Sequence, residues 1–152
     1  MTITFTVPGR PLSKGSMRPV ISKSTGKPFL KPSNPKLGGW MSCVALFASE
    51  AWGGQGRQVI VDGPVWLELT YRFERPKSHF GTGRNANKLK SSAPEYPTGK
   101  NRTDVDKMER AVLDALTDII YRDDSQVVGV NHAKRWATES ALAVKVITGD
   151  GN

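Results

Sequence analysis

The chain has 152 residues, of which 38% are hydrophobic and 24% charged, and it carries a formal net charge of +8 with a pI near 9.8. This composition predicts one domain with its own core, and the excess of positive charge predicts a polyanionic partner. No apolar run approaches the roughly 20 residues of a membrane span, the N-terminus lacks a signal-peptide pattern, and Cys43 is the only cysteine. We therefore expect a cytoplasmic protein without disulfides or membrane attachment that binds nucleic acid.

The N-terminal part of the chain is strongly basic. Residues 2–7 alternate apolar and polar side chains, which predicts a half-buried strand. Residues 10–36 then contain seven Lys and Arg, five Pro and no acid, and the first acidic residue of the chain is Glu50. A solvated loop is one explanation, but an acid-free run of this length favours contact with phosphates. The candidate DNA ligands of this basic loop are Arg10, Lys14 and Arg18.

The next two segments predict a helix and a strand. Residues 35–52 carry apolar side chains at helical spacing after Asn34-Pro35, a pair that favours the start of a helix. The glycines that follow Trp52 end this helix. Residues 65–73 alternate again, with every second side chain apolar, and predict a second strand.

Residues 75–102 show no periodicity and contain seven basic residues with a single acid, Glu95. A loop of this length in a compact domain is usually functional or disordered. We expect a flexible arm that contacts DNA and becomes ordered on binding, and Phe80 could stack on distorted DNA. The candidate DNA ligands of the arm are Arg75, Lys77, Arg84, Lys88, Lys90, Lys100 and Arg102.

Seven of the 14 acidic residues lie between residues 101 and 128, and an acidic cluster in a basic protein calls for a cation. Apolar residues at intervals of three and four predict an amphipathic helix from Asp104 or Val105 to Ile120. Asp104 and Asp106 can converge only if Asp104 precedes the first turn, where the backbone is still extended. A second acidic pair, Asp123-Asp124, follows the helix, and it can join the first pair only if its loop folds back.

Each acid also has a structural explanation. Asp104 could be the N-cap of the helix, and Asp106 with Glu109 resembles a capping box. The acids further along fit a solvated helix face and an ordinary turn. Because a helix has one N-cap, capping explains only one of Asp104 and Asp106. Spacing alone leaves the metal site and these structural roles equally open.

Two closing strands are predicted at residues 126–136 and 141–148, the second with a buried face of alternating apolar side chains. Lys134 and Arg135 lie on the first of them and are further candidate DNA ligands. The order strand, helix, strand, arm, helix, strand, strand predicts one α+β domain, residues 1–152, with a single small mixed sheet packed with two helices.

The run from Asp104, D-V-D-K-M-E-R-A-V-L-D-A-L-T, followed by Y-R-D-D-S-Q-V-V, resembles the signature of the RusA family of Holliday junction resolvases from bacteria and their phages. Two carboxylate motifs and the helix between them agree in order and spacing. The segment V-P-G-R-P-L-S-K-G-S-M-R-P resembles phage-borne members more weakly. The resemblance implies a homodimer that nicks four-way and other branched DNA with Mg²⁺, for which Mn²⁺ can substitute.

The same resemblance implies the site residues. Its metal ligands carry over to Asp104, Asp106 and Asp124, with Asp123 in reserve. The family's catalytic lysine falls at Arg110, which keeps the positive charge but leaves proton transfer in question because arginine stays protonated. Symmetric cutting of a four-way junction needs two active sites, and a two-fold dimer supplies them.

Other functions are weighed against this one. A non-catalytic module for branched DNA would gain nothing from carboxylates beside its phosphate-binding surface, because they repel the ligand. A phosphatase with an aspartate nucleophile has its motif after an apolar strand, whereas polar residues precede Asp104. A metal-dependent nuclease acting on RNA stays open, since no feature of the sequence addresses the 2′-hydroxyl. We expect a Mg²⁺-dependent endodeoxyribonuclease.

Overall fold

A computed structural model of the chain describes residues 1–15, 17–32, 34–53, 61–99 and 104–149. The predicted DNA ligands Lys100 and Arg102 lie outside these ranges, and the side chain of Arg18 is also outside the description. None of the described helices is long and apolar enough to cross a membrane.

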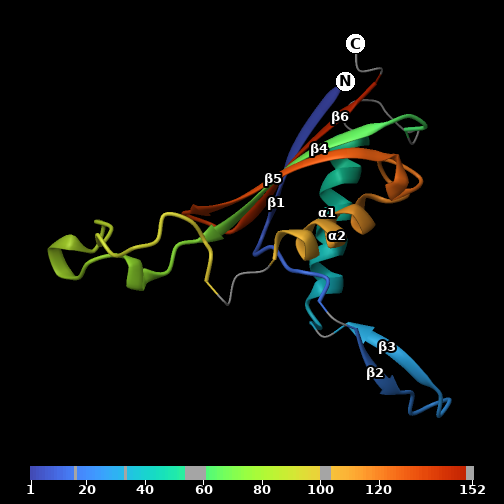
Figure 1. Ribbon diagram of the computed structural model, residues 1–152, viewed down its shortest axis with the longest axis horizontal. Coiled ribbons are helices and arrows are strands. Elements are labelled where there is room, and N and C mark those ends of the chain that lie inside the picture. The colour runs from blue at the N-terminus through green and yellow to red at the C-terminus, as the bar shows by residue number, and fades with distance from the viewer. Residues whose placement is uncertain (16, 33, 54–60, 100–103, 150–152) are drawn as a thin grey trace.

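The body of the molecule is a four-stranded mixed sheet with two helices (Figure 1). The strand order is β1-β6-β4-β5, in which β4 and β5 are parallel and the other neighbours are antiparallel. The strands are β1 (Thr2–Pro8), β4 (Val65–Glu74), β5 (Val127–Ala137) and β6 (Ala141–Thr148), and the helices are α1 (Leu37–Gly53) and α2 (Val105–Leu116). The predicted α+β class, with a mixed sheet and two helices, is confirmed.

The core forms where the helices meet one face of the sheet. Alternation along β4 buries every second side chain from Val65 to Phe73. Met108 and Val112 of α2 and Val44 of α1 are fully buried and belong to the same cluster. Burial of each such side chain stabilises the fold by roughly 1.5–3 kcal/mol. This packing fixes α2, and with it the acidic residues at its start, against the sheet.

The prediction of a loop at residues 10–36 is wrong in one respect, because these residues contain a β-hairpin. Strands β2 (Met17–Ile21) and β3 (Pro28–Pro32) pair antiparallel and project from the body (Figure 1). The turn is closed by a hydrogen bond from the Ser22 amide to the Lys27 carbonyl at 2.9 Å. Proline is excluded from the middle of a sheet, but a two-stranded hairpin has only edge strands, where proline is tolerated.

Helix α2 ends four residues before the predicted Ile120. Thr117 has an extended backbone (φ −62°, ψ 138°), and Asp118 has a φ of 64°, so the helical path stops at Leu116. Ile120 is nevertheless fully buried. The apolar spacing therefore continued past the helix because the following turn returns Ile120 to the core.

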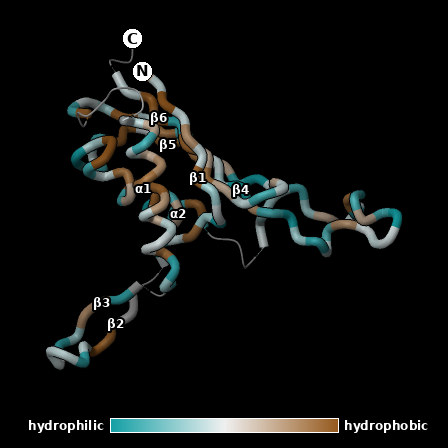
Figure 2. The backbone as a smooth tube through the Cα atoms, turned by 180° about the vertical axis from the view of Figure 1, so that it is seen from behind, coloured by the Kyte–Doolittle hydropathy of each residue, from teal (hydrophilic) through white to brown (hydrophobic). Residues whose placement is uncertain are grey.

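The described part of the arm, residues 75–99, lacks long regular elements, as predicted. It contains two short 3-10 turns, η1 (Lys77–His79) and η2 (Gly83–Asn85), and an isolated bridge between Phe80 and Leu89. Both views show it projecting from the end of the sheet, and Figure 2 shows it mostly in the hydrophilic colours. Its flexibility in solution and its ordering by DNA stay predictions.

Candidate active site

Asp104 stands at the N-terminus of α2 but does not cap it. Its backbone is extended (φ −68°, ψ 138°), as convergence with Asp106 requires, and its side chain makes no capping hydrogen bond. The carboxylate is instead 3.2 Å from the Lys107 Nζ and about two-thirds exposed, at 66%. An exposed ion pair of this kind is weak. The Asp104 carboxylate is therefore accessible to a cation that approaches the helix end.

Asp106 and Arg110 lie one turn apart on the exposed face of α2. Neither side chain has an ion-pair partner among the residues that the structure describes. The capping-box explanation for Asp106 does not hold, because the N-cap is Asp104 and the Glu109 carboxylate lies 3.0 Å from the His132 Nε2. A carboxylate and a guanidinium are thus presented to solvent without an ion pair in the described part of the chain.

The loop after α2 folds back along the helix. The Tyr121 hydroxyl donates to the Leu113 carbonyl at 2.8 Å, and the Asp118 amide donates to the Tyr121 carbonyl at 2.7 Å. Burial, and then the nearby charges of Asp124 and Asp114, raise the pKa of the Tyr121 hydroxyl. Asp124 therefore lies beside the C-terminal half of α2.

The fold-back places Asp124 near Tyr121, whose hydroxyl contacts α2 at Leu113, three residues after Arg110. Leu113, which Tyr121 contacts, is seven residues after Asp106, a rise of about 10 Å along the helix axis. Arg110 lies between these two levels. In the described part of the chain, no three His, Cys, Asp or Glu side chains are close enough to hold one metal ion. The structure thus does not bring the three predicted ligands together into one metal site.

Asp123 and Asp124 have different roles in the turn. Asp123 is the N-cap of the 3-10 turn η3 (Asp124–Gln126), where its carboxylate accepts from the Ser125 amide at 2.8 Å. Hydrogen bonds from the Ser125 side chain and backbone lower the pKa of the Asp123 carboxyl. Asp123 is therefore occupied in holding the turn, and Asp124 is the better candidate ligand of the two.

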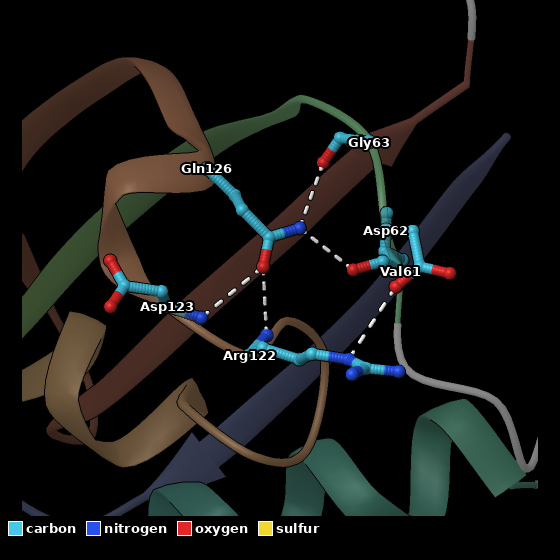
Figure 3. A network of polar contacts seen from close by, with 6 residues as sticks. All are labelled: Val61, Asp62, Gly63, Arg122, Asp123 and Gln126. Carbon is cyan, nitrogen blue, oxygen red and sulfur yellow. Dashed lines mark hydrogen bonds and ion pairs between the residues drawn. The ribbon is translucent and has the colours of Figure 1, made fainter.

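Gln126 holds the turn to the segment before β4 (Figure 3). Its Nε2 donates to the carbonyls of Val61 at 2.7 Å and Gly63 at 3.1 Å. Its Oε1 accepts from the amides of Arg122 at 2.9 Å and Asp123 at 3.2 Å. All four partners are backbone groups, so this one side chain fixes the position from which Asp124 projects.

We expect Gln126→Ala to lower the free energy of unfolding by about 2 kcal/mol, because four hydrogen bonds are lost and each contributes roughly 0.5–1.5 kcal/mol. Thermal and urea unfolding measure the change. Asn131→Ala, an amide on β5 that is exposed and has no hydrogen bond among the described side chains, is the matched control and should be nearly neutral. Equal stability of the two variants would contradict the role given to Gln126.

The structure adds a polar cluster that sequence reasoning missed. Glu109 of α2 meets His132 of β5 at 3.0 Å, with about a third or less of each side chain exposed. The Tyr71 hydroxyl of β4 is buried without a hydrogen-bond partner in the described part of the chain. Burial, and then the charge of Glu109, raise the pKa of this hydroxyl. No local pattern predicts the cluster, because its members come from three separate elements.

The predicted DNA ligands fall into two groups. Lys77, Arg84, Lys88 and Lys90 are exposed on the arm and have no ion-pair partner among the described residues. The others make contacts within the protein. Lys14 forms an ion pair with Asp114, and Lys134 of β5 is half-buried. Three guanidinium groups lie over aromatic rings: Arg10 over Phe73, Arg75 over Trp136 and Arg135 over Tyr96. Asp114 is therefore not paired with Arg110, and the arm presents the more accessible positive charge.

The chain is similar to known proteins over nearly its whole length. The model of the family described as Endodeoxyribonuclease RusA matches residues 8–147, which include both acidic motifs and α2. An uncharacterized protein of Bacillus subtilis (strain 168), YqaN, is 34% identical over 148 residues, which are 95% of this chain and 94% of that protein. Because the family match extends over nearly the whole chain, the protein belongs to the RusA family of endodeoxyribonucleases.

Proposed function

We propose that the protein is a Mg²⁺-dependent, structure-selective endodeoxyribonuclease that resolves Holliday junctions and other branched DNA by paired nicks. Membership of the RusA family supports a nuclease. The observation that carries the proposal is the pair of carboxylates at the start of α2. Asp104 occupies the N-cap position without capping, and Asp106 is exposed with no ion-pair partner among the described residues.

The donor chemistry of this pair fits Mg²⁺. This ion prefers oxygen ligands and is commonly bound through one or two carboxylates while it keeps several waters. Asp104 and Asp106 would hold the ion at the helix end, and Asp124 is the proposed third ligand. When bound, the ion would polarise the scissile phosphate and help to generate the nucleophile.

Arg110 is proposed to act on the phosphate. Its guanidinium is fixed in the charged state and lies one turn after Asp106 on an exposed helix face. From there it would offset the negative charge that develops on the phosphoryl oxygens during cleavage. It would not transfer a proton, since a guanidinium stays protonated in proteins.

The DNA is proposed to bind through the arm and the basic N-terminal segment. The exposed Lys77, Arg84, Lys88 and Lys90 would contact phosphates, as would the residues of the hairpin, Lys23, Lys27 and Lys31. Two protomers related by a two-fold axis would place one active site on each of two strands, which paired nicking requires. Binding through phosphates makes the affinity strongly dependent on salt.

The experiment that tests the proposal compares labelled four-way, Y-shaped and linear duplex DNA, each incubated with and without Mg²⁺. We expect paired nicks in the branched substrates with Mg²⁺ and none in EDTA. A four-way junction with RNA arms, run beside the DNA junction, tests the competing activity on RNA. Cleavage in EDTA, equal cutting of linear duplex, or preference for the RNA arms would each refute a named part of the proposal.

A further inference from the structure

The arm meets the end of the sheet at a pocket of about 520 Å³. Phe80 and Leu89 line it from the arm, and Arg75 and Trp136 line it from the ends of β4 and β5. Pockets that bind small organic groups have volumes of about 300–1,000 Å³. The site is separate from the acidic face of α2, and no step of the proposed cleavage uses it.

The aromatic wall of the pocket is held in a fixed orientation. The Trp136 indole Nε1 and an Arg75 guanidinium nitrogen both donate to the Pro94 carbonyl, at 3.1 and 2.9 Å. The Arg75 guanidinium lies 5.2 Å from the centre of the Trp136 ring, and the His79 ring packs against Trp136 edge-on at 5.1 Å. These contacts come from three parts of the chain and hold Trp136 against the base of the arm.

The part of the lining that comes from the arm is shaped by a closed loop. The Lys90 amide donates to the His79 carbonyl at 2.9 Å, and the Gly81 amide donates to the Lys88 carbonyl at 3.0 Å. A Cβ atom on Gly81 would lie 2.7 Å from the Asn85 carbonyl oxygen, so only glycine allows this close approach. The loop thereby sets Phe80 and Leu89 side by side.

The charges around the pocket fit an anion beside an apolar group. Arg75 and Lys77 line it together with one acid, Glu74. Further along the arm, Lys88 and Arg84 are exposed and have no ion-pair partner among the described residues. An aromatic interior with a basic rim matches a nucleotide, whose base stacks on aromatic rings while its phosphate meets cations. A base next to a branch point can lose its stacking neighbour across the branch, so it leaves the helix at a lower cost than a base inside a continuous duplex.

We propose that this pocket binds one unpaired nucleobase of DNA at the branch point, stacked against Phe80 and Trp136, with Lys77 on the flanking phosphate. The proposal rests on the proposed function and deepens it, because it gives the chain a means to distinguish a branch from a linear duplex. Base stacking on aromatic side chains tolerates every sequence, since every base has an aromatic face. The pocket therefore recognises structure rather than sequence.

The test combines a protein variant with a DNA variant. Phe80→Ala should bind a four-way junction roughly tenfold or more weakly than the parent, the usual effect of losing one stacking platform. A junction with abasic nucleotides at the branch point should bind the parent equally weakly, and Phe80→Ala should cause no further loss on it. The control Leu46→Ala removes an apolar side chain of α1 that is 55% exposed and lies outside the proposed DNA-binding segments, and it should leave both affinities unchanged.

A second readout does not depend on cleavage. A duplex with a single unpaired 2-aminopurine should lose fluorescence when the parent binds, and Phe80→Ala should bind without this loss. Parental affinity and nicking by Phe80→Ala on the intact junction, together with undiminished binding of the abasic junction by the parent, would refute the pocket proposal and leave the proposed function standing. If the parent protein does not cut branched DNA but still quenches the fluorescence of the unpaired base, the proposed nuclease function is refuted and the proposed base-binding pocket is supported. Unchanged melting temperature of Phe80→Ala confirms that the loss is not misfolding.

Discussion

Asp106→Asn is expected to abolish nicking of a four-way junction while the affinity for the junction stays the same or rises. The substitution keeps the shape of the side chain but removes a charged oxygen ligand for Mg²⁺. It also removes a negative charge that repels the DNA backbone. Asp106 is exposed in the first turn of α2, so its loss should leave the fold intact. Asp104→Asn should behave in the same way, at the cost of one exposed ion pair with Lys107.

The structure provides a matched control for these variants in Asp118. This carboxylate is exposed in the turn after α2 at a φ of 64°, a conformation that asparagine adopts as readily as aspartate. Asp118→Asn therefore removes one negative charge from the same region without strain. Nicking by Asp118→Asn should equal that of the parent. Nicking by Asp106→Asn at the parent rate, with Mg²⁺ titrated, would remove Asp106 from the proposed metal site.

Local patterns in the sequence predicted the body of the fold because the spacing of apolar residues along each strand and helix matches the side chains that are buried. The alternation in residues 65–73 became the buried face of β4, and the spacing from Val105 became α2. The predicted end of α2 was wrong because Ile120 stays buried after the helix ends at Leu116. Apolar spacing records which side chains reach the core, whereas the end of a helix depends on the backbone of the next residues.

The site was less accessible to sequence reasoning because its geometry depends on contacts between distant segments. The fold-back of the loop rests on the hydrogen bond from Tyr121 to Leu113, and the position of Asp124 rests on Gln126 reaching Val61 and Gly63. Such contacts between distant segments produce no periodic pattern in the sequence. The resemblance in the motif around Asp124 indicated its importance, and the structure gives the physical reason for the glutamine beside it.

Arg110→Ala is expected to reduce the rate of nicking about 10²-fold or more, because transition-state charge on the phosphate would lose its compensating cation. Arg110→Lys should retain most of the activity, since lysine restores the charge at the same helix position. A structural role predicts the opposite pattern, in which alanine lowers the melting temperature and leaves the rate unchanged. The structure argues against that role, because Asp114 is paired with Lys14, and Arg110 has no ion-pair partner among the described residues.

Lys107→Ala separates a specific effect of Arg110 from a general loss of positive charge. Lys107 lies on the same helix and pairs with Asp104 at 3.2 Å, so its removal changes the net charge equally. If Arg110 acts on the phosphate, single-turnover rates at saturating junction should fall much further for Arg110→Ala than for Lys107→Ala. Equal losses in the two variants would mean that the helix end needs positive charge only to attract DNA. Strong loss in Arg110→Lys would show instead that the planar guanidinium contacts two phosphoryl oxygens at once, a geometry that lysine cannot reproduce.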